Sequence, residues 1–176
     1  MTRFLRLFLR DTSGVAAAEL ALMLPLLALL LFGGMELSNL MWAEHQVVKS
    51  VRNGARFAAR QAPSNFTCGA SNLGAADTQV RNLIRTGSLD GQGDPVVRKW
   101  TDGSASTIAI SVECDTASAY STGGIYRDAS GTGSPAIPSA MRVKIDVTVP
   151  YPALFGTFSL GSYNLRAEGQ SPVTGF

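Results

Sequence analysis

The stretch Val15–Met35, which reads VAAAELALMLPLLALLLFGGM, decides the fold. Glu19 is its only charged residue. A helix over these positions would be roughly 31 Å long at a rise of about 1.5 Å per residue, which matches the hydrocarbon thickness of a bilayer. Pro25 falls inside the run, and a membrane helix tolerates proline better than a soluble helix does. The stretch therefore predicts a membrane-spanning helix.

A short basic segment precedes this apolar run. It carries Arg3, Arg6 and Arg10 against a single acidic residue, Asp11. Arginine and lysine are enriched on the cytoplasmic side of membranes. We therefore expect a cytoplasmic N-terminus, with the chain after Met35 on the other side of an inner membrane.

The small residue expected of a processing signal lies at the N-terminal end of the apolar run. An ordinary secretory signal has small residues one and three positions before a cut at its far end. Here a cut after Gly34 would place the bulky Phe32 at the third position. Gly14 instead precedes the apolar run, and Glu19 follows it by five positions.

A basic leader, a glycine, this glutamate and an apolar helix together resemble the processing signal of type IV prepilins and pseudopilins. The resemblance implies that a prepilin peptidase cuts between Gly14 and Val15 and removes residues 1–14. It also implies that Glu19 faces the N-terminal ammonium of a neighbouring subunit. A carboxylate in hydrocarbon costs several kcal/mol, which independently favours a partner. The alternative is that Glu19 only extends to the cytoplasmic interface.

The helix is expected to continue beyond the membrane, over residues 15–61. Residues 36–61 contain no proline. Apolar or small side chains recur there at helical spacing, at Leu37, Met41, Val48, Val51, Ala55 and Ala58. We therefore expect three parts: a leader at 1–14, a transmembrane and stalk helix at 15–62, and a periplasmic head at 63–176.

A basic ridge follows the outer half of this helix. Lys49, Arg52, Arg56 and Arg60 recur by threes and fours, so they lie on one face. Such a ridge is either a solvated helix face or an edge that meets acidic groups on a partner subunit.

The sequence at the end of the helix resembles one particular family of pilin-like proteins. The run QVVKSVRNGARFAAR, with Gly54, Ala55 and Arg56 at its centre, is similar to the motif that closes the N-terminal helix of TadE-like proteins. These are minor pseudopilins of tight-adherence (Flp, type IVc) pilus systems. The distal pattern VKIDVTVPYPALFG…LGSYNLRAEG also resembles TadE-like chains. Glycine inside a helix costs about 1 kcal/mol relative to alanine, so we expect close packing at Gly54.

The distal part is predicted to be a small α+β domain. A helix is expected over Ala75–Thr86, where Gly87 stops it. Alternating apolar residues predict strands at Thr107–Cys114, at Met141–Val149 and from Tyr163 to near Pro172. These strands would form an antiparallel sheet that buries one face against the long N-terminal helix, as in pilins.

Cys68 and Cys114 are the only two cysteines, and both follow the membrane segment. An even count in an oxidising compartment favours a disulfide between them. In the chain-entropy model, closing this loop would stabilise the domain by about 4 kcal/mol. The alternative is a pair of buried free thiols.

No catalytic, metal or cofactor site is predicted. His45 is the single histidine and lies on the stalk helix, where we expect an interfacial or packing role. Asp90 and Asp94 lie among glycines, but they provide too few spaced oxygen ligands for a calcium loop. The sequence has no zinc spacing and no phosphate loop. Its net charge of +2, without a distal basic cluster, argues against nucleic-acid binding.

Three functions fit these features. The first is a non-catalytic minor pilin or pseudopilin whose partners are a prepilin peptidase, other pilin subunits and the pilus assembly platform. The second is a membrane-anchored periplasmic binding or adhesion module that uses the long Asp115–Ala140 loop as its contact surface. The third is a membrane-tethered hydrolase, for which the sequence offers no convincing residues. The first is preferred.

Overall fold

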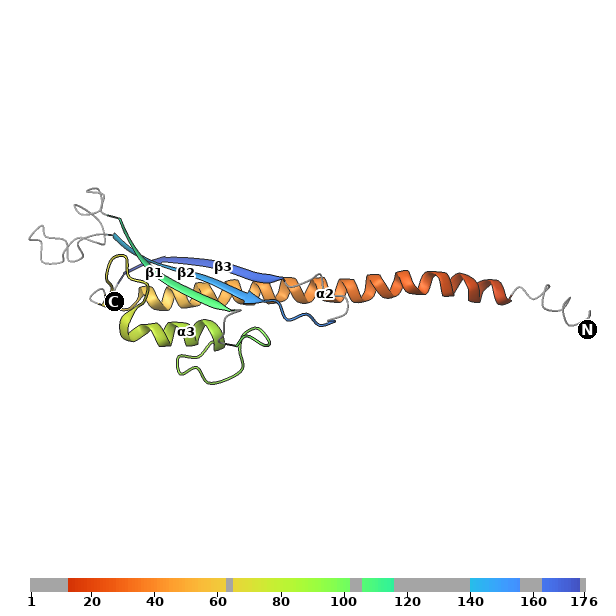
Figure 1. The fold of residues 1–176 in the computed structure, drawn as a ribbon, viewed down its shortest axis with the longest axis horizontal. Coiled ribbons are helices and arrows are strands. Elements are labelled where there is room, and N and C mark those ends of the chain that lie inside the picture. The colour runs from red at the N-terminus through yellow and green to blue at the C-terminus, as the bar shows by residue number, and fades with distance from the viewer. Residues whose placement is uncertain (1–12, 63–64, 102–105, 116–139, 156–162, 175–176) are drawn as a thin grey trace, which may run out of the picture. The chain divides into compact units, whose positions relative to one another are not determined.

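The computed structural model describes residues 13–62, 65–101, 106–115, 140–155 and 163–174. Most of the leader and most of the Asp115–Ala140 loop lie outside these ranges. The elements, labelled as in Figure 1, are α2 (Ser13–Ala59), η2 (Gly74–Ala76), α3 (Asp77–Thr86), β1 (Thr107–Asp115), β2 (Ala140–Pro150) and β3 (Asn164–Pro172). The predicted α+β arrangement, with a long N-terminal helix and a small antiparallel sheet, is confirmed.

The described chain divides into two compact units. The N-terminal unit contains residues 13–39 and 153–155. The C-terminal unit contains residues 40–152 and 163–174, apart from the positions that the structure does not describe.

The N-terminal unit is built on the apolar part of α2. Its leucines between positions 20 and 31 are all more than half exposed, and Leu22 reaches 80%. Pro25 lies within the helix without ending it. The helix that starts here is long and apolar enough to cross a membrane. This exposed apolar helix is therefore a candidate single-pass membrane anchor.

In the C-terminal unit the outer half of α2 buries one stripe of small and branched residues. The stripe consists of Ala43, Val47, Val51, Ala55 and Ala58, each at most 2% exposed. The buried face predicted from the sequence is therefore partly wrong. Met41, which the sequence placed on this face, is 57% exposed, and Leu37 of the N-terminal unit is 52% exposed.

The three strands form one antiparallel sheet in the order β1-β2-β3. Ile145 of the central strand pairs with Ile110 on one side and with Gly169 on the other. Side chains along β2 alternate between the two faces, so Val143, Ile145, Val147 and Val149 are buried while the residues between them are more exposed. The three strands predicted from alternation are confirmed, within one or two residues at their ends.

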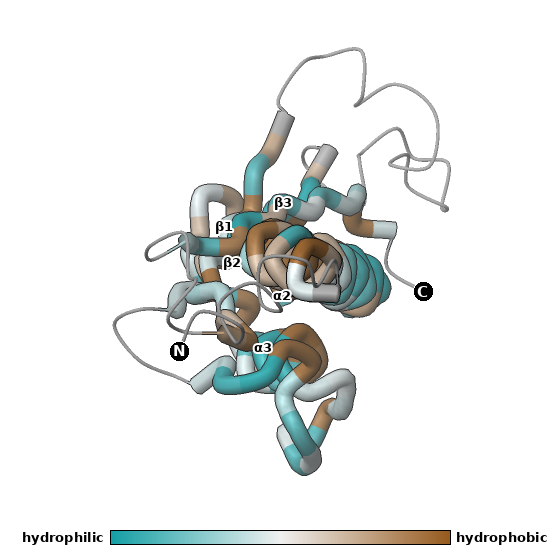
Figure 2. The backbone as a smooth tube through the Cα atoms, turned by 90° about the vertical axis from the view of Figure 1, so that its right-hand side faces the viewer, coloured by the Kyte–Doolittle hydropathy of each residue, from teal (hydrophilic) through white to brown (hydrophobic). Residues whose placement is uncertain are grey.

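Helix α3 lies beside α2 in the C-terminal unit, on the side opposite β3 (Figure 1). Figure 2, turned by 90°, shows the same order of β3, α2 and α3. Val80 and Ile84 provide the buried face of α3. Gly87 ends the helix with a left-handed φ of 76° and donates its N–H to the Leu83 carbonyl, as predicted for a glycine C-cap.

Candidate functional site

The predicted processing site lies in the first turn of α2. This helix begins at Ser13, so the Gly14–Val15 peptide bond is near its N-terminal end. Val15 is 57% exposed, and a Cβ placed on Gly14 would meet no atom within 4 Å. Glu19 is exposed one turn further along. Positions 15 and 19 are neighbours on one helix face.

Glu36, at the C-terminal end of the apolar run, is a buried carboxylate that was not predicted from the sequence. Glu36 directly follows Met35 and is only 8% exposed. The backbone N–H of Leu154 donates to both carboxylate oxygens at 3.1 and 3.2 Å, and the N–H of Phe155 donates to Oε2 at 3.1 Å. All of these residues belong to the N-terminal unit.

An aromatic pair lies next to this carboxylate. The rings of Phe32 and Phe155 are 5.2 Å apart between centroids and meet edge to face at 69°. The Glu36 contacts span 118 and 119 positions in the sequence, so no local spacing could have revealed them. The only signal was a glutamate placed directly after an apolar run.

In the Gly54–Arg56 motif the first two residues pack in the core and the third lies on the surface. A Cβ on Gly54 would come within 2.8 Å of Ile84 Cδ1 and closer still to Cγ1, so glycine allows α2 and α3 to approach each other. Ala55 is 1% exposed in the same core, whereas Arg56 is exposed. The motif is therefore mainly a helix-packing element.

A second close approach joins β3 to α2. A Cβ on Gly169 would lie 2.8 Å from Val51 Cγ1 and 3.3 Å from the Val51 carbonyl oxygen. Gly169 is not among the packing positions predicted from the sequence. A glycine inside an alternating strand is the signal that could have identified it, because such a residue often marks a close backbone approach.

The structure joins Cys68 and Cys114 in a disulfide, as predicted, with a Cα–Cα distance of 5.6 Å. The segment beside Cys68 also pairs with β1. The N–H of Gly69 donates to the Val112 carbonyl, and the N–H of Val112 donates to the Ala70 carbonyl, both at 2.9 Å. The disulfide therefore holds this segment to the edge of the sheet.

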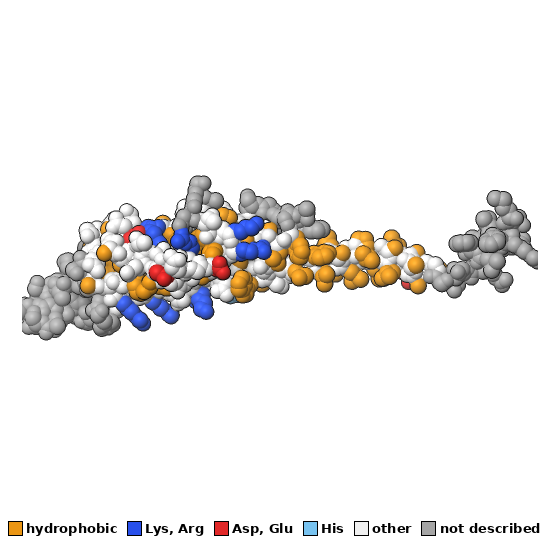
Figure 3. All heavy atoms as spheres, turned by 90° about the horizontal axis from the view of Figure 1, so that it is seen from below, with side chains coloured by type: hydrophobic (Ala, Val, Ile, Leu, Met, Phe, Trp, Pro, Cys, Tyr) orange, Lys and Arg blue, Asp and Glu red, His pale blue; other side chains and the backbone are white. Residues whose placement is uncertain are grey.

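The basic ridge of α2 is exposed at all four positions, Lys49, Arg52, Arg56 and Arg60. Basic side chains project from the surface of the C-terminal unit in Figure 3. This exposure agrees with both interpretations of the ridge, a solvated face or a partner contact.

Charged side chains on the open face of the sheet pair with one another. Arg142 contacts Glu113 across β1 and β2 at 2.7 Å. Lys144 lies 3.6 Å from Asp146 and 3.5 Å from Glu168. The Asp146 charge, followed by that of Glu168, raises the pKa of Lys144. The pairs Arg142–Glu113 and Lys144–Glu168 cross between strands, whereas Lys144–Asp146 lies within β2. Such largely solvated ion pairs stabilise a sheet modestly.

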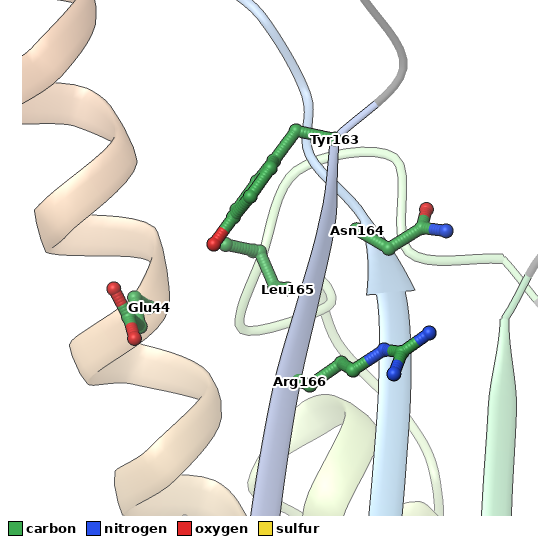
Figure 4. Close-up of a pocket in the computed structure, with 5 residues that line it drawn as sticks. All are labelled: Glu44, Tyr163, Asn164, Leu165 and Arg166. Atoms are coloured by element: carbon green, nitrogen blue, oxygen red, sulfur yellow. The ribbon is translucent and has the colours of Figure 1, made fainter.

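A shallow hollow of about 380 Å³ lies between α2 and β3. It is lined by Glu44, Tyr163, Asn164, Leu165 and Arg166. Tyr163 and Leu165 point toward α2 in Figure 4, whereas Asn164 and Arg166 point away from it. The polar groups of Asn164 and Arg166 therefore do not face Glu44 across the hollow.

The described residues contain no group of three or more histidine, cysteine, aspartate or glutamate side chains that could hold a metal ion. His45 is exposed on α2 and is not among the residues that line the hollow. Asp90 accepts hydrogen bonds from the Ser88 hydroxyl and from the backbone N–H of Gln92, which lower its pKa. Its carboxylate therefore serves the local turn.

Residues 14–56 match the model of the TadE-like protein family. The match confirms the resemblance over α2 and includes Gly14, Glu19 and the Gly54–Arg56 motif. No curated protein and no solved structure matches the chain. The family match indicates involvement in the assembly of a tight-adherence pilus.

Proposed function

We propose that this TadE-like chain is a non-catalytic minor pilin or pseudopilin of a tight-adherence pilus. Its N-terminal helix would pack with the helices of other pilin-type subunits in the inner membrane, next to the assembly platform. One observation carries the proposal: the segment that matches the family exposes leucines around α2, all above 50% between positions 20 and 31. Apolar surface of this extent requires lipid or other apolar helices to cover it.

Charge and redox chemistry support the proposed orientation of the chain. The arginines of the leader favour a cytoplasmic N-terminus. The Cys68–Cys114 disulfide requires an oxidising compartment, which supports a periplasmic location for the head at residues 63–176. The expected product is a single-pass protein of the inner membrane with a disulfide-bonded periplasmic head.

The N-terminal end of α2 supports processing followed by pairing. Cleavage between Gly14 and Val15 would leave an ammonium group on Val15, one helical turn from Glu19. A carboxylate inside hydrocarbon is costly unless a positive group neutralises it. The ammonium of a neighbouring subunit would neutralise Glu19 when the helices align, which couples cleavage to assembly.

The mature N-terminus tests the processing step. In cells that contain a prepilin peptidase, mass spectrometry should find a chain that starts at Val15. Deletion of the peptidase, or substitution Gly14→Leu, should preserve residues 1–14, because a large side chain blocks the small-residue position before the cut. If the chain that starts at Met1 supports normal piliation in peptidase-containing cells, the proposal is wrong.

Glu19→Ala tests the pairing step. Membrane insertion should be unchanged, because the substitution removes the one charge from the apolar run. Incorporation with other subunits should fall about tenfold, which corresponds to about 1.4 kcal/mol of lost association energy. Cross-linking yield and surface pili provide the measurements. Glu44→Ala, at an exposed glutamate further along α2, is the matched control and should assemble normally.

A further inference from the structure

We infer that the boundary segment, Ala153–Phe155, inserts into the outer edge of the bilayer while Glu36 holds it in place. Its partner would be a lipid surface, specifically the boundary between headgroups and acyl chains. This inference rests on the proposed membrane span of α2. It adds a second element of the chain that contacts the membrane.

The aromatic contact gives the depth of this segment relative to the apolar run. Phe155 packs against Phe32, which lies four residues before Glu36 and inside the run. Four residues of helix correspond to about 6 Å of rise. The boundary segment therefore overlaps the last turn of the apolar run, where a spanning helix leaves the hydrocarbon.

The hydrogen bonds to Glu36 allow the non-helical backbone of the boundary segment to lie at the edge of the bilayer. Non-helical backbone at membrane depth is tolerated only where its polar groups have partners. The N–H groups of Leu154 and Phe155 both donate to the Glu36 carboxylate. Glu36 is 8% exposed, and these hydrogen bonds to its carboxylate are charge-assisted. The contact therefore gives hydrogen-bond partners both to the two backbone N–H groups and to the charged carboxylate of Glu36 near the bilayer.

The exposed surface around the segment is apolar. Leu154 is 41% exposed, and Met35 and Leu37 of the same unit are 50% and 52% exposed. This surface continues directly from the leucine-rich face of α2. A lipid boundary is therefore the occupant that its position and chemistry favour.

Depth-dependent quenching tests this inference on the full-length protein. Both native cysteines are in the disulfide, so Leu154→Cys would provide the only free thiol for an environment-sensitive fluorophore. The protein is reconstituted into vesicles of phosphatidylcholine and phosphatidylglycerol that contain a lipid with a nitroxide near the carbonyl end of its chain. Leu89→Cys is the matched control, because Leu89 is 43% exposed in the C-terminal unit. We expect about twofold stronger quenching at position 154, because shallow nitroxides reach only groups in the boundary region.

A third label separates this inference from the membrane span itself. Leu27→Cys lies inside the apolar run and should be quenched by a nitroxide placed deeper in the chain. Quenching at position 27 with equal quenching at positions 154 and 89 would overturn the inference and leave the span intact. Absence of quenching at position 27 would overturn the span and, with it, the inference.

The holding role of Glu36 has its own measurement. In the Leu154→Cys protein, Glu36→Ala should reduce the quenching toward the level at position 89, while circular dichroism shows that the helix content is kept. Glu36→Gln retains one carbonyl acceptor and should give an intermediate value. Glu44→Ala is the matched control on the same helix. Unchanged quenching in Glu36→Ala would refute the role of Glu36.

Discussion

Replacing Cys68 and Cys114 by serine is expected to lower the free energy of unfolding of the C-terminal unit by about 4 kcal/mol. The bond closes a loop across 46 positions, so the reduced unfolded chain gains considerable conformational freedom. Small domains are stable by only about 5–15 kcal/mol, so this loss would be a large share of the total. Urea unfolding in detergent micelles, followed by the fluorescence of the buried Trp100 after the exposed Trp42 is replaced by phenylalanine, measures it.

Single variants provide the control for this prediction. Cys68 is exposed and Cys114 only partly buried, so loss of packing contributes little. Cys68→Ser alone, Cys114→Ser alone and the double variant should therefore lose nearly the same stability, because each removes the same cross-link. The two backbone hydrogen bonds between residues 69–70 and Val112 should keep the fold native before urea is added. Additive losses in the double variant would contradict the loop-closure explanation.

Gly54→Val is expected to destabilise the C-terminal unit by about 3 kcal/mol, the upper end of the usual cost of overpacking. Ile84 is fully buried, so its side chain cannot move into solvent to make room for the new atoms. Glycine and valine differ little in helix propensity, so the loss reports the contact between α2 and α3. The same unfolding experiment measures it.

Two further variants make the Gly54 result specific. Asn53→Val places the same side chain at the exposed neighbouring position and should change stability by less than about 0.5 kcal/mol. Ile84→Ala removes the atoms that valine would meet. The Gly54→Val/Ile84→Ala double variant should therefore lose less stability than the sum of the two single losses. A simple sum would show that Gly54 and Ile84 do not interact.

The sequence alone determined the elements of this protein. An apolar run with a single charged residue predicted the part of α2 that could span a membrane, and period-two alternation predicted the three strands. A pair of cysteines after the membrane segment predicted the disulfide. These features are local or compositional, so spacing and counting suffice to find them. The cleavage at Gly14 and the pairing of Glu19 stay predictions.

Only the tertiary structure decided which face of α2 is buried and which groups bind Glu36 at the end of the apolar run. Ala43 and Gly54 are buried, whereas the larger Leu37 and Met41 are exposed. At Gly54 the absence of a side chain leaves room for Ile84 of α3. Glu36 finds its partners at Leu154 and Phe155, more than a hundred positions away. Contacts at such separations depend on how the chain folds back, which no local periodicity records.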